Sequence, residues 1–342
     1  MNIIGYIKKH ANNSFQEFPF TEVDNLILSL LPYLNLTDIV TNKKITIKEA
    51  NRLYLEKKEL ERGIFNGNTK DMFNLLAKTN RYSNILLYNY VRVINDEMQF
   101  GAITCKLTNK LTYIAFAGTD SSIVGWEEDF KLAYLYPGTS QKYAANYLKR
   151  TIGLFEKNII VGGHSKGGNL AIASVMLNKR RIKNKIKNIY NNDGPGFLKE
   201  QIESKEYKAI DNKIKMYVPK DSIIGMLLYH TDNYTVVKAK GINILQHDAF
   251  NWMCNETSFI LDKQTIRSKI LEKKLTKKLE ELPIPKRTLL VKNLFLIFKI
   301  NKIKDTKDIK IKNLFNLIKS FQGLDPETKN LLTEFMLILF IK

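Results

Sequence analysis

The sequence of 342 residues contains only two cysteines and no long apolar run. Cys105 and Cys254 are far apart and lack the close spacing of a metal site, so we predict no metal and no disulfide framework. No stretch reaches the roughly 18 apolar residues that cross a bilayer. The N-terminal lysines are not followed by the apolar region of a signal peptide. A globular protein in a reducing, cytoplasmic setting is therefore expected.

Acidic residues are outnumbered, because 34 Asp and Glu against 54 Lys and Arg give a formal net charge of +20. Residues 261–342 alone contain 19 basic and 9 acidic residues. Such a charge is typical of proteins that bind nucleic acids or anionic membranes. No basic run alternates with the stacking aromatics of single-strand binders, so we predict no nucleic-acid partner. Two hypotheses remain for the basic segment: peripheral contact with an anionic membrane, or packing on the core with solvated lysines.

Residues 1–85 are predicted to form a helical N-terminal segment that packs on the core. Residues 21–24 match a capping box, in which the Thr21 hydroxyl and the Asp24 carboxylate satisfy free amide groups. Helical patterns also occur at residues 45–60 and 69–78. One apolar face recurs at helical spacing after the capping box: Val23, Leu26, Ile27, Leu30 and Leu31.

Residues 86–258 are predicted to form an α/β core. Three strands separated by short turns predict an antiparallel meander: 90–94, 99–107 and 111–116. Short apolar strands then alternate with helices, which is typical of a parallel sheet covered on both faces: helices 140–155 and 166–179, strands 158–162, 186–190 and 214–218. Residues 259–342 are predicted to form a basic, helical C-terminal region.

The segment Gly163–Gly167, Gly-His-Ser-Lys-Gly, follows an apolar strand and precedes a helix. A serine hydroxyl attacks a carbonyl only when a base removes its proton and donors stabilise the oxyanion. Small residues on both sides of a serine permit the strained strand-to-helix turn that exposes it, and the helix directs backbone amides at the oxyanion. Ser165 is therefore the predicted nucleophile, with Gly163 and Gly167 forming the elbow. The alternative is a tight glycine turn with an incidental serine.

With this elbow, the chain resembles α/β-hydrolases, in particular class-three lipases and a related bacterial family of lipase-like serine hydrolases with unassigned substrates. The resemblance extends from about Phe20 to Trp252. It implies an α/β-hydrolase fold, with a mostly parallel central sheet, antiparallel N-terminal strands, and helical N- and C-terminal extensions. Six sequence blocks carry it: residues 113–120, 125–129, 163–167, 190–197, 218–225 and 246–252.

The resemblance also implies the oxyanion hole. In such lipases a Gly-Ser or Gly-Thr pair after an early strand supplies the first donor, which corresponds here to Thr119 after Gly118. The backbone amide of Lys166 is the implied second donor. Ala117 departs from the pattern, which usually has Arg at this place. That change is expected to loosen the loop without removing an attacking or proton-transferring group.

Four histidines are candidates for the base. In this fold the base follows the nucleophile and the acid in the chain, in a loop after the last strands. His10 is at a terminus, and His164 is adjacent to Ser165 and is expected to point away as a supporting residue. His247 follows the strand-like residues 234–238 and falls in the block that resembles the lipase histidine. His247 is therefore the predicted base, with His230 as the alternative.

Two aspartates compete as the acid of the triad. Asp221 follows the strand at 214–218, the usual position of the acid in such enzymes, and is the first choice. Asp193 follows the preceding strand, a position that some lipases use, and it stays open as the alternative. The one that does not serve is expected to cap a turn, as Asp often does beside Gly and Pro. Asp248 is too close to His247 in sequence to orient its ring.

Residues 121–136 are rich in aromatic side chains, among them Trp126 and Phe130. Lipases have a lid or a wall of the acyl pocket at this position; the alternative is a helix that packs its aromatic side on the sheet. Taken together, the sequence predicts a serine hydrolase that cleaves an acyl ester through an acyl-enzyme, without a cofactor. The competing hypothesis is a non-catalytic binding protein of the same fold.

Overall fold

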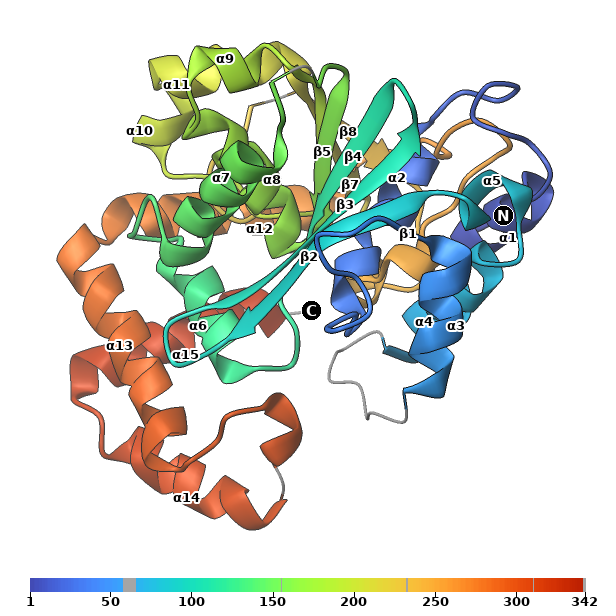
Figure 1. Cartoon of the computed structure of the whole chain (residues 1–342). Helices are drawn as coiled ribbons and strands as arrows, with labels where there is room; N and C mark the ends of the chain where they lie inside the picture. The colour runs from blue at the N-terminus through green and yellow to red at the C-terminus, as the bar shows by residue number, and fades with distance from the viewer. Residues whose placement is uncertain (58–65, 155, 232, 310, 341–342) are drawn as a thin grey trace.

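The computed structural model describes residues 1–57, 66–154, 156–231, 233–309 and 311–340. Residues 58–60 and Phe155, at the ends of two predicted helices, lie outside these ranges. A single sheet of eight strands forms the centre of the molecule (Figure 1), and its strands follow one another in chain order. They are β1 (Ile45–Thr46), β2 (Leu86–Ile94), β3 (Gln99–Thr108), β4 (Leu111–Phe116), β5 (Ile159–His164), β6 (Ile186–Asn192), β7 (Ile214–Pro219) and β8 (Tyr234–Val237).

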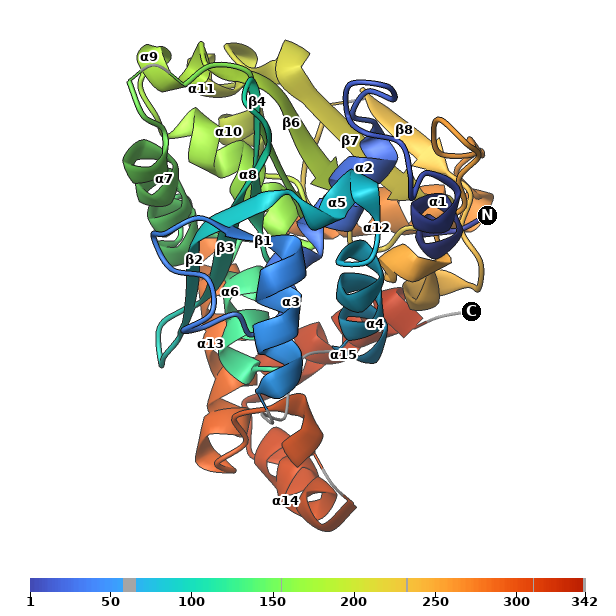
Figure 2. The ribbon, with the colours of Figure 1, turned by 45° about the vertical axis from the view of Figure 1, so that its right-hand side comes forward.

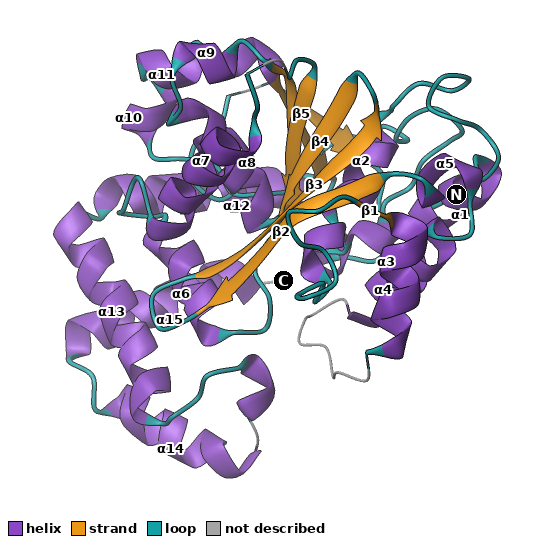
Figure 3. Cartoon of the chain, viewed as in Figure 1, coloured by secondary structure: helices purple, strands orange, loops and turns teal. Residues whose placement is uncertain are grey.

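Helices surround this sheet (Figure 3). The α-helices are α1 (Ile3–Lys9), α2 (Glu22–Ser29), α3 (Ile47–Glu56), α4 (Asn66–Leu76), α5 (Asn80–Ser83), α6 (Ile123–Lys131), α7 (Thr139–Thr151), α8 (Lys166–Met176), α9 (Arg180–Lys183), α10 (Lys199–Ile202), α11 (Lys205–Lys208), α12 (Ile266–Glu281), α13 (Ile284–Ile300), α14 (Ile311–Gln322) and α15 (Pro326–Phe340). The short 3₁₀ helices are η1 (Leu31–Tyr33), η2 (Asp211–Lys213), η3 (Asn243–His247), η4 (Ala249–Asn251) and η5 (Thr306–Asp308).

The pairing of neighbouring strands changes once across the sheet, from antiparallel to parallel. Strands β1 to β4 pair in antiparallel fashion, and β4 to β8 pair in parallel. The first part can be antiparallel because short turns join β2, β3 and β4, whereas each later strand returns through a helix or long loop. The structure thus confirms the predicted α/β-hydrolase fold, with a mostly parallel sheet preceded by an antiparallel meander.

Alternation of side chains along the strands divides the core into two layers. Tyr113 and Ala115 of β4 belong to one buried cluster, and Ile114 and Phe116 belong to the other. Helices α7 and α8 cover the second face, while the N-terminal helices cover the first (Figure 3). Because both faces of the central strands are covered, β5 is buried along its whole length. The helix that follows the elbow is therefore fixed on the sheet.

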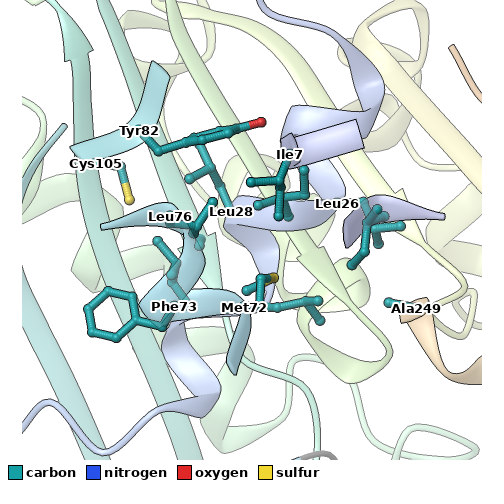
Figure 4. Packing of buried hydrophobic residues seen from close by; sticks show 14 of the residues in the cluster. Ile7, Leu26, Leu28, Met72, Phe73, Leu76, Tyr82, Cys105 and Ala249 are labelled. Carbon is teal, nitrogen blue, oxygen red and sulfur yellow. The ribbon is translucent and has the colours of Figure 1, made fainter. Parts of the chain in front are cut away.

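The N-terminal helices share one apolar core with the sheet. Ile7 of α1, Leu26 of α2, Phe73 of α4 and Cys105 of β3 belong to one buried cluster (Figure 4). The predicted capping box at Thr21 is present at the start of α2. Asp24 of that box also forms a fully buried ion pair with Arg81, with a distance of 2.7 Å between Nη2 and Oδ2. This buried pair fixes α2 against α5.

The C-terminal helices lie beside α6 and α12 (Figure 1), and α14 is at the end of the molecule farthest from β5–β8 (Figure 2). Leu271, Leu275 and Leu279, the apolar stripe of α12, are buried. For α12, packing of the stripe in the interior is therefore what the structure shows. Its lysines are exposed, except for Lys278, which is half-buried beside Glu334. Within the described residues, no helix is both long and apolar enough to cross a membrane.

Candidate active site

Ser165 stands between the end of β5 and the start of α8. Its backbone has φ 57° and ψ −135°, a left-handed conformation that L-residues rarely adopt outside special turns. The strain is held by the neighbouring strand, because the Ser165 N–H donates to Asn192 O at 3.0 Å. Ser165 is only partly buried, whereas all its neighbours from Val161 to Leu170 are buried. The turn therefore leaves Ser165 partly accessible to solvent, while the residues on both sides of it are fixed in the interior.

The two glycines of the elbow are required by close backbone approaches. A Cβ at Gly163 would lie 2.2 Å from the carbonyl carbon of Gly167. A Cβ at Gly167 would lie 2.1 Å from Phe116 O on β4. Because both contacts are with backbone, which cannot swing away, any side chain at either position would force the turn apart. The spacing noted in the sequence thus has a steric cause.

His247 lies at the end of η3, next to the elbow. The ring centroids of His247 and His164, the residue before Ser165, are 4.6 Å apart. His247 Nδ1 lies 2.7 Å from Asp193 Oδ2, and the two side chains are 13% and 1% exposed. An ionised carboxylate only accepts, so this contact places the proton of a neutral ring on Nδ1 and leaves Nε2 as the basic nitrogen.

Asp193 follows directly after β6 and is held by several groups. Its backbone has φ 52°, and its N–H donates to Tyr217 O at 2.8 Å. The carboxylate also accepts hydrogen bonds at Oδ1 from the Ser222 hydroxyl and from the Gly225 N–H. These bonds fix Oδ1 and leave Oδ2 to His247. Asp193 therefore has both the reach and the orientation of a triad acid.

Asp221, the first choice from sequence, does not contact His247. Its carboxylate accepts from the Thr265 hydroxyl at 2.5 Å and from Gln246 Nε2 at 3.2 Å. Its own N–H donates to Gln246 Oε1 at 3.0 Å. The geometry therefore favours Asp193, the alternative from sequence, over Asp221 as the partner of His247. Asp221 instead fixes the residue before His247 to the start of α12, and so holds the loop that carries the base.

The other histidines lie away from the serine or point away from it. His230 Nε2 is 3.7 Å from Glu272 Oε1 on α12. His10 Nε2 is 2.7 Å from Glu256 O, far along the chain from the elbow. The structure thus offers His230 and His10 other partners, as expected of structural histidines.

His164 has the supporting position that its place in the elbow predicts. Burial lowers the pKa of His164 to about 3, so its ring is neutral across the working range of most enzymes. Its Nε2 lies 2.8 Å from His247 O, and its Nδ1 lies 3.1 Å from the Tyr33 hydroxyl. A neutral ring can donate at Nε2 and accept at Nδ1. His164 therefore supports the backbone of His247 rather than competing with it as a base.

The loop after β4 brings Gly118 and Thr119 against the serine. A Cβ at Gly118 would lie 2.9 Å from Ser165 Cβ. The Thr119 hydroxyl donates to Asp129 Oδ2 at 2.5 Å, which turns the side chain away and leaves the backbone N–H as the group available to an oxyanion. Among the described residues, the N–H groups of Thr119 and Lys166 have no hydrogen-bond partner. Two unsatisfied donors beside a serine are what an oxyanion hole needs.

Several polar residues around the site were missed by the sequence reasoning. Burial raises the pKa of Asp129, the partner of Thr119, to about 6, and the nearby Lys166 opposes this rise. Glu128 and Gln99 bind the Lys166 side chain in the interior. Glu128 and Asp129 lie within the recognised block at residues 125–129, which was a usable signal. Gln99 and Tyr33 had none, because no motif in the sequence around either residue indicates a role.

A protein-family profile described as Mbeg1-like matches residues 76–296, more than half of the chain. The chain belongs to the Mbeg1-like family, a lipase-like family. No curated protein matches the chain significantly.

Solved structures that this family member resembles include two lipases. One is M37 lipase, at 16% identity, with 59% of this chain and 68% of that chain covered and a TM-score of 0.35. The other is a fungal lipase in complex with an inhibitor, at 16% identity, with coverages of 49% and 68% and a TM-score of 0.34.

In this Mbeg1-like chain, the predicted lid segment is tied to the C-terminal region. Ile123 N–H, at the start of α6, donates to Lys304 O at 2.8 Å, and Phe130 makes an edge-on contact with Phe295 of α13 at 5.5 Å. Beyond the end of α6, Arg287 donates to Ala133 O at 2.9 Å. Trp126 Nε1 is buried without a partner in the described structure. Helix α6 is thus held at both ends, and the assignment of Trp126 and Phe130 to a lid or acyl pocket stays a prediction.

Proposed function

We propose that this member of the Mbeg1-like family is a serine hydrolase that cleaves carboxylic esters. The observation that carries the proposal is the 2.7 Å contact between His247 Nδ1 and Asp193 Oδ2, beside a serine held at φ 57°. A base oriented by a buried carboxylate next to a partly exposed serine is the arrangement that activates a hydroxyl for attack.

The proposed reaction has two halves. His247 Nε2 takes the proton of Ser165 as Oγ attacks the ester carbon, and the backbone N–H groups of Thr119 and Lys166 stabilise the oxyanion. The intermediate collapses, the alcohol leaves with the proton from His247, and the acyl group stays on Ser165. A water molecule then gives its proton to His247 and attacks the acyl carbon. When this second intermediate collapses, His247 returns the proton to Ser165 Oγ and the carboxylic acid is released. Asp193 stays ionised throughout and stabilises the imidazolium.

The substrate class follows from the lipase-like family rather than from a described pocket. We propose a lipid or lysophospholipid ester first, with small esters and thioesters as members of the same reaction class. None of these steps uses a metal or an organic cofactor.

Labelling with a fluorophosphonate probe tests the proposal, because this probe reacts with an activated serine and not with an ordinary one. The wild-type chain should be labelled at Ser165, and Ser165→Ala should not be labelled. Ser258→Ala is a matched control, because its hydroxyl donates to Asn255 Oδ1 in a turn distant from the elbow in sequence, and labelling should persist. An unlabelled wild-type chain would instead favour the non-catalytic binding protein.

If Ser165 is labelled, the next experiment identifies which class of ester is hydrolysed. Turnover of a panel of p-nitrophenyl esters, monoacylglycerols, lysophospholipids and acyl thioesters should be measured for wild type and Ser165→Ala. Turnover that persists in Ser165→Ala would refute the assignment of the nucleophile.

A further inference from the structure

A series of buried polar side chains connects the two proposed oxyanion donors, the backbone N–H groups of Thr119 and Lys166, through the interior of the protein. The ammonium of Lys166 donates to Gln99 Oε1 at 2.7 Å, to Gln99 O at 2.9 Å and to Glu128 Oε2 at 3.1 Å. All three side chains are buried. They come from α8, β3 and α6, three elements distant in sequence. Lys166 therefore supplies a backbone N–H to the site and sends its side chain back into the core.

The amide of Gln99 carries the connection to the other donor. Gln99 Nε2 donates to Gly118 O at 3.2 Å. That carbonyl belongs to the same peptide unit as the Thr119 N–H, and in a planar trans peptide the two groups point in opposite directions. A bond that holds Gly118 O from the inside therefore turns the Thr119 N–H outward, toward Ser165.

Glu128 completes the chain and leaves none of its oxygens unused. Oε2 accepts from the Gln99 N–H at 2.9 Å as well as from Lys166, and Oε1 accepts from the Ser140 hydroxyl at 2.6 Å. A buried ion pair costs desolvation and is often replaceable by apolar residues without loss of stability. Its value here is geometric, because it fixes the direction of the Lys166 side chain and thereby the amide of Gln99.

We propose that Gln99 is a positioning residue that aligns the oxyanion hole, with Lys166 and Glu128 holding its amide in place. This inference rests on the proposed function and adds a residue that acts through Gly118 rather than on substrate. It predicts a defect confined to stabilisation of the tetrahedral state, since neither the serine nor its base touches Gln99.

The main test is Gln99→Met, which keeps the length and apolar stem of the side chain but removes the donor to Gly118 and the Oε1 acceptor of Lys166. The Lys166 ammonium keeps Gln99 O and Glu128 Oε2 as acceptors. We expect kcat to fall by about tenfold to a hundredfold, less than or similar to the loss of a whole oxyanion donor, while KM changes by less than about twofold. Affinity for a trifluoromethyl ketone, which forms a tetrahedral adduct with the serine, should fall by the same factor as kcat/KM. A purely structural role would not produce this parallel.

Gln141→Met is the matched control. Gln141 is also a buried glutamine with two hydrogen bonds, from Gly138 N–H and to Asn169 Oδ1. Its replacement should lower the melting temperature by a comparable amount and leave kcat near the wild-type value. If Gln99→Met does not fold, Glu128→Gln retains the shape and should give the same parallel loss of kcat and ketone affinity.

In the measurements of kcat and ketone affinity, two results would overturn the inference: kcat of Gln99→Met within twofold of wild type, or a fall in kcat with unchanged ketone affinity. Failure of the proposed function looks different, because the wild-type chain would then not react with a fluorophosphonate. Equal fluorophosphonate labelling rates for wild type and Gln99→Met would refute the role of Gln99 alone.

Discussion

Replacing Asp193 with Asn tests which carboxylate orients the base. The amide oxygen of the replacement can still accept from Ser222 and Gly225 at the Oδ1 position. At the Oδ2 position, 2.7 Å from His247 Nδ1, an NH₂ group would replace an acceptor. The ring would then have to accept at Nδ1 and carry its proton on Nε2, where it cannot take the proton of Ser165.

This change of tautomer determines how far kcat is expected to fall. In the triad template, the same substitution lowers kcat by about four powers of ten while the geometry persists. We therefore expect kcat for an ester substrate to fall by about 10³- to 10⁴-fold, or about 4 to 5.5 kcal/mol at 1.36 kcal/mol for each factor of ten. The fold should be intact, since one amide replaces one carboxylate of equal shape.

Asp221→Asn is the matched control for this experiment. Its partners are Thr265 and Gln246, so its loss loosens the loop before His247 without changing the tautomer. We expect less than about a tenfold fall in kcat, on the scale of one or two lost hydrogen bonds. Initial rates of p-nitrophenyl ester hydrolysis for both variants decide the matter. A larger loss in Asp221→Asn than in Asp193→Asn would refute the reasoning, as would less than tenfold loss in Asp193→Asn.

Three further predictions follow from described contacts. His247→Ala should abolish ester turnover nearly as completely as Ser165→Ala, because nucleophile and base act as a unit, and His230→Ala should change it little; the reverse order in a rate assay would mean that the base is His230. Burial raises the pKa of Asp129 from 3.8 to about 6, so the stability that its protonated form contributes is present below pH 3.8 and is lost as pH rises through 6. Urea midpoints measured across this pH range should show that Asp129→Asn reduces the loss. A pH profile of stability that the substitution leaves unchanged would contradict the burial argument. The third variant replaces three exposed lysines of α12, Lys273, Lys274 and Lys277, by glutamate. Because the leucine stripe of α12 is buried, we expect this variant to alter turnover of soluble ester and of ester in anionic vesicles equally. If each lysine contributed about 1 kcal/mol of lipid binding, turnover would instead fall roughly a hundredfold on vesicles alone.

The sequence alone was sufficient for features that depend on neighbours in the chain. The capping box at Thr21 acts over three residues, and the strand, glycine turn and helix around Ser165 follow one another directly. Such local patterns need no knowledge of distant segments, because spacing, side-chain size and periodicity determine them. The change from antiparallel to parallel pairing was also accessible, since short turns join the antiparallel part and helices separate most of the parallel part.

The choice between Asp193 and Asp221 needed the tertiary structure. Both follow neighbouring parallel strands, β6 and β7, and such strands end at the same edge of the sheet. Sequence therefore predicts both carboxylates near the base but not which one reaches it. That depends on the path of the loop around His247, which Asp221 itself fixes through Gln246.

The chain of Gln99, Lys166 and Glu128 was inaccessible from sequence for a related reason. Gln99 and Lys166 are 67 residues apart, and Glu128 and Lys166 are 38 apart. The local sequence around Gln99, at the start of a strand, does not indicate that its side chain will contact the Lys166 ammonium in the interior. The meeting arises from the pairing of β3, β4 and β5 and from the packing of α6 against β3, which bring the three polar groups into one interior site where each must find a partner. The turn that carries the proposed nucleophile was thus determined by local sequence, and the alignment of the groups around it by the packing of distant segments.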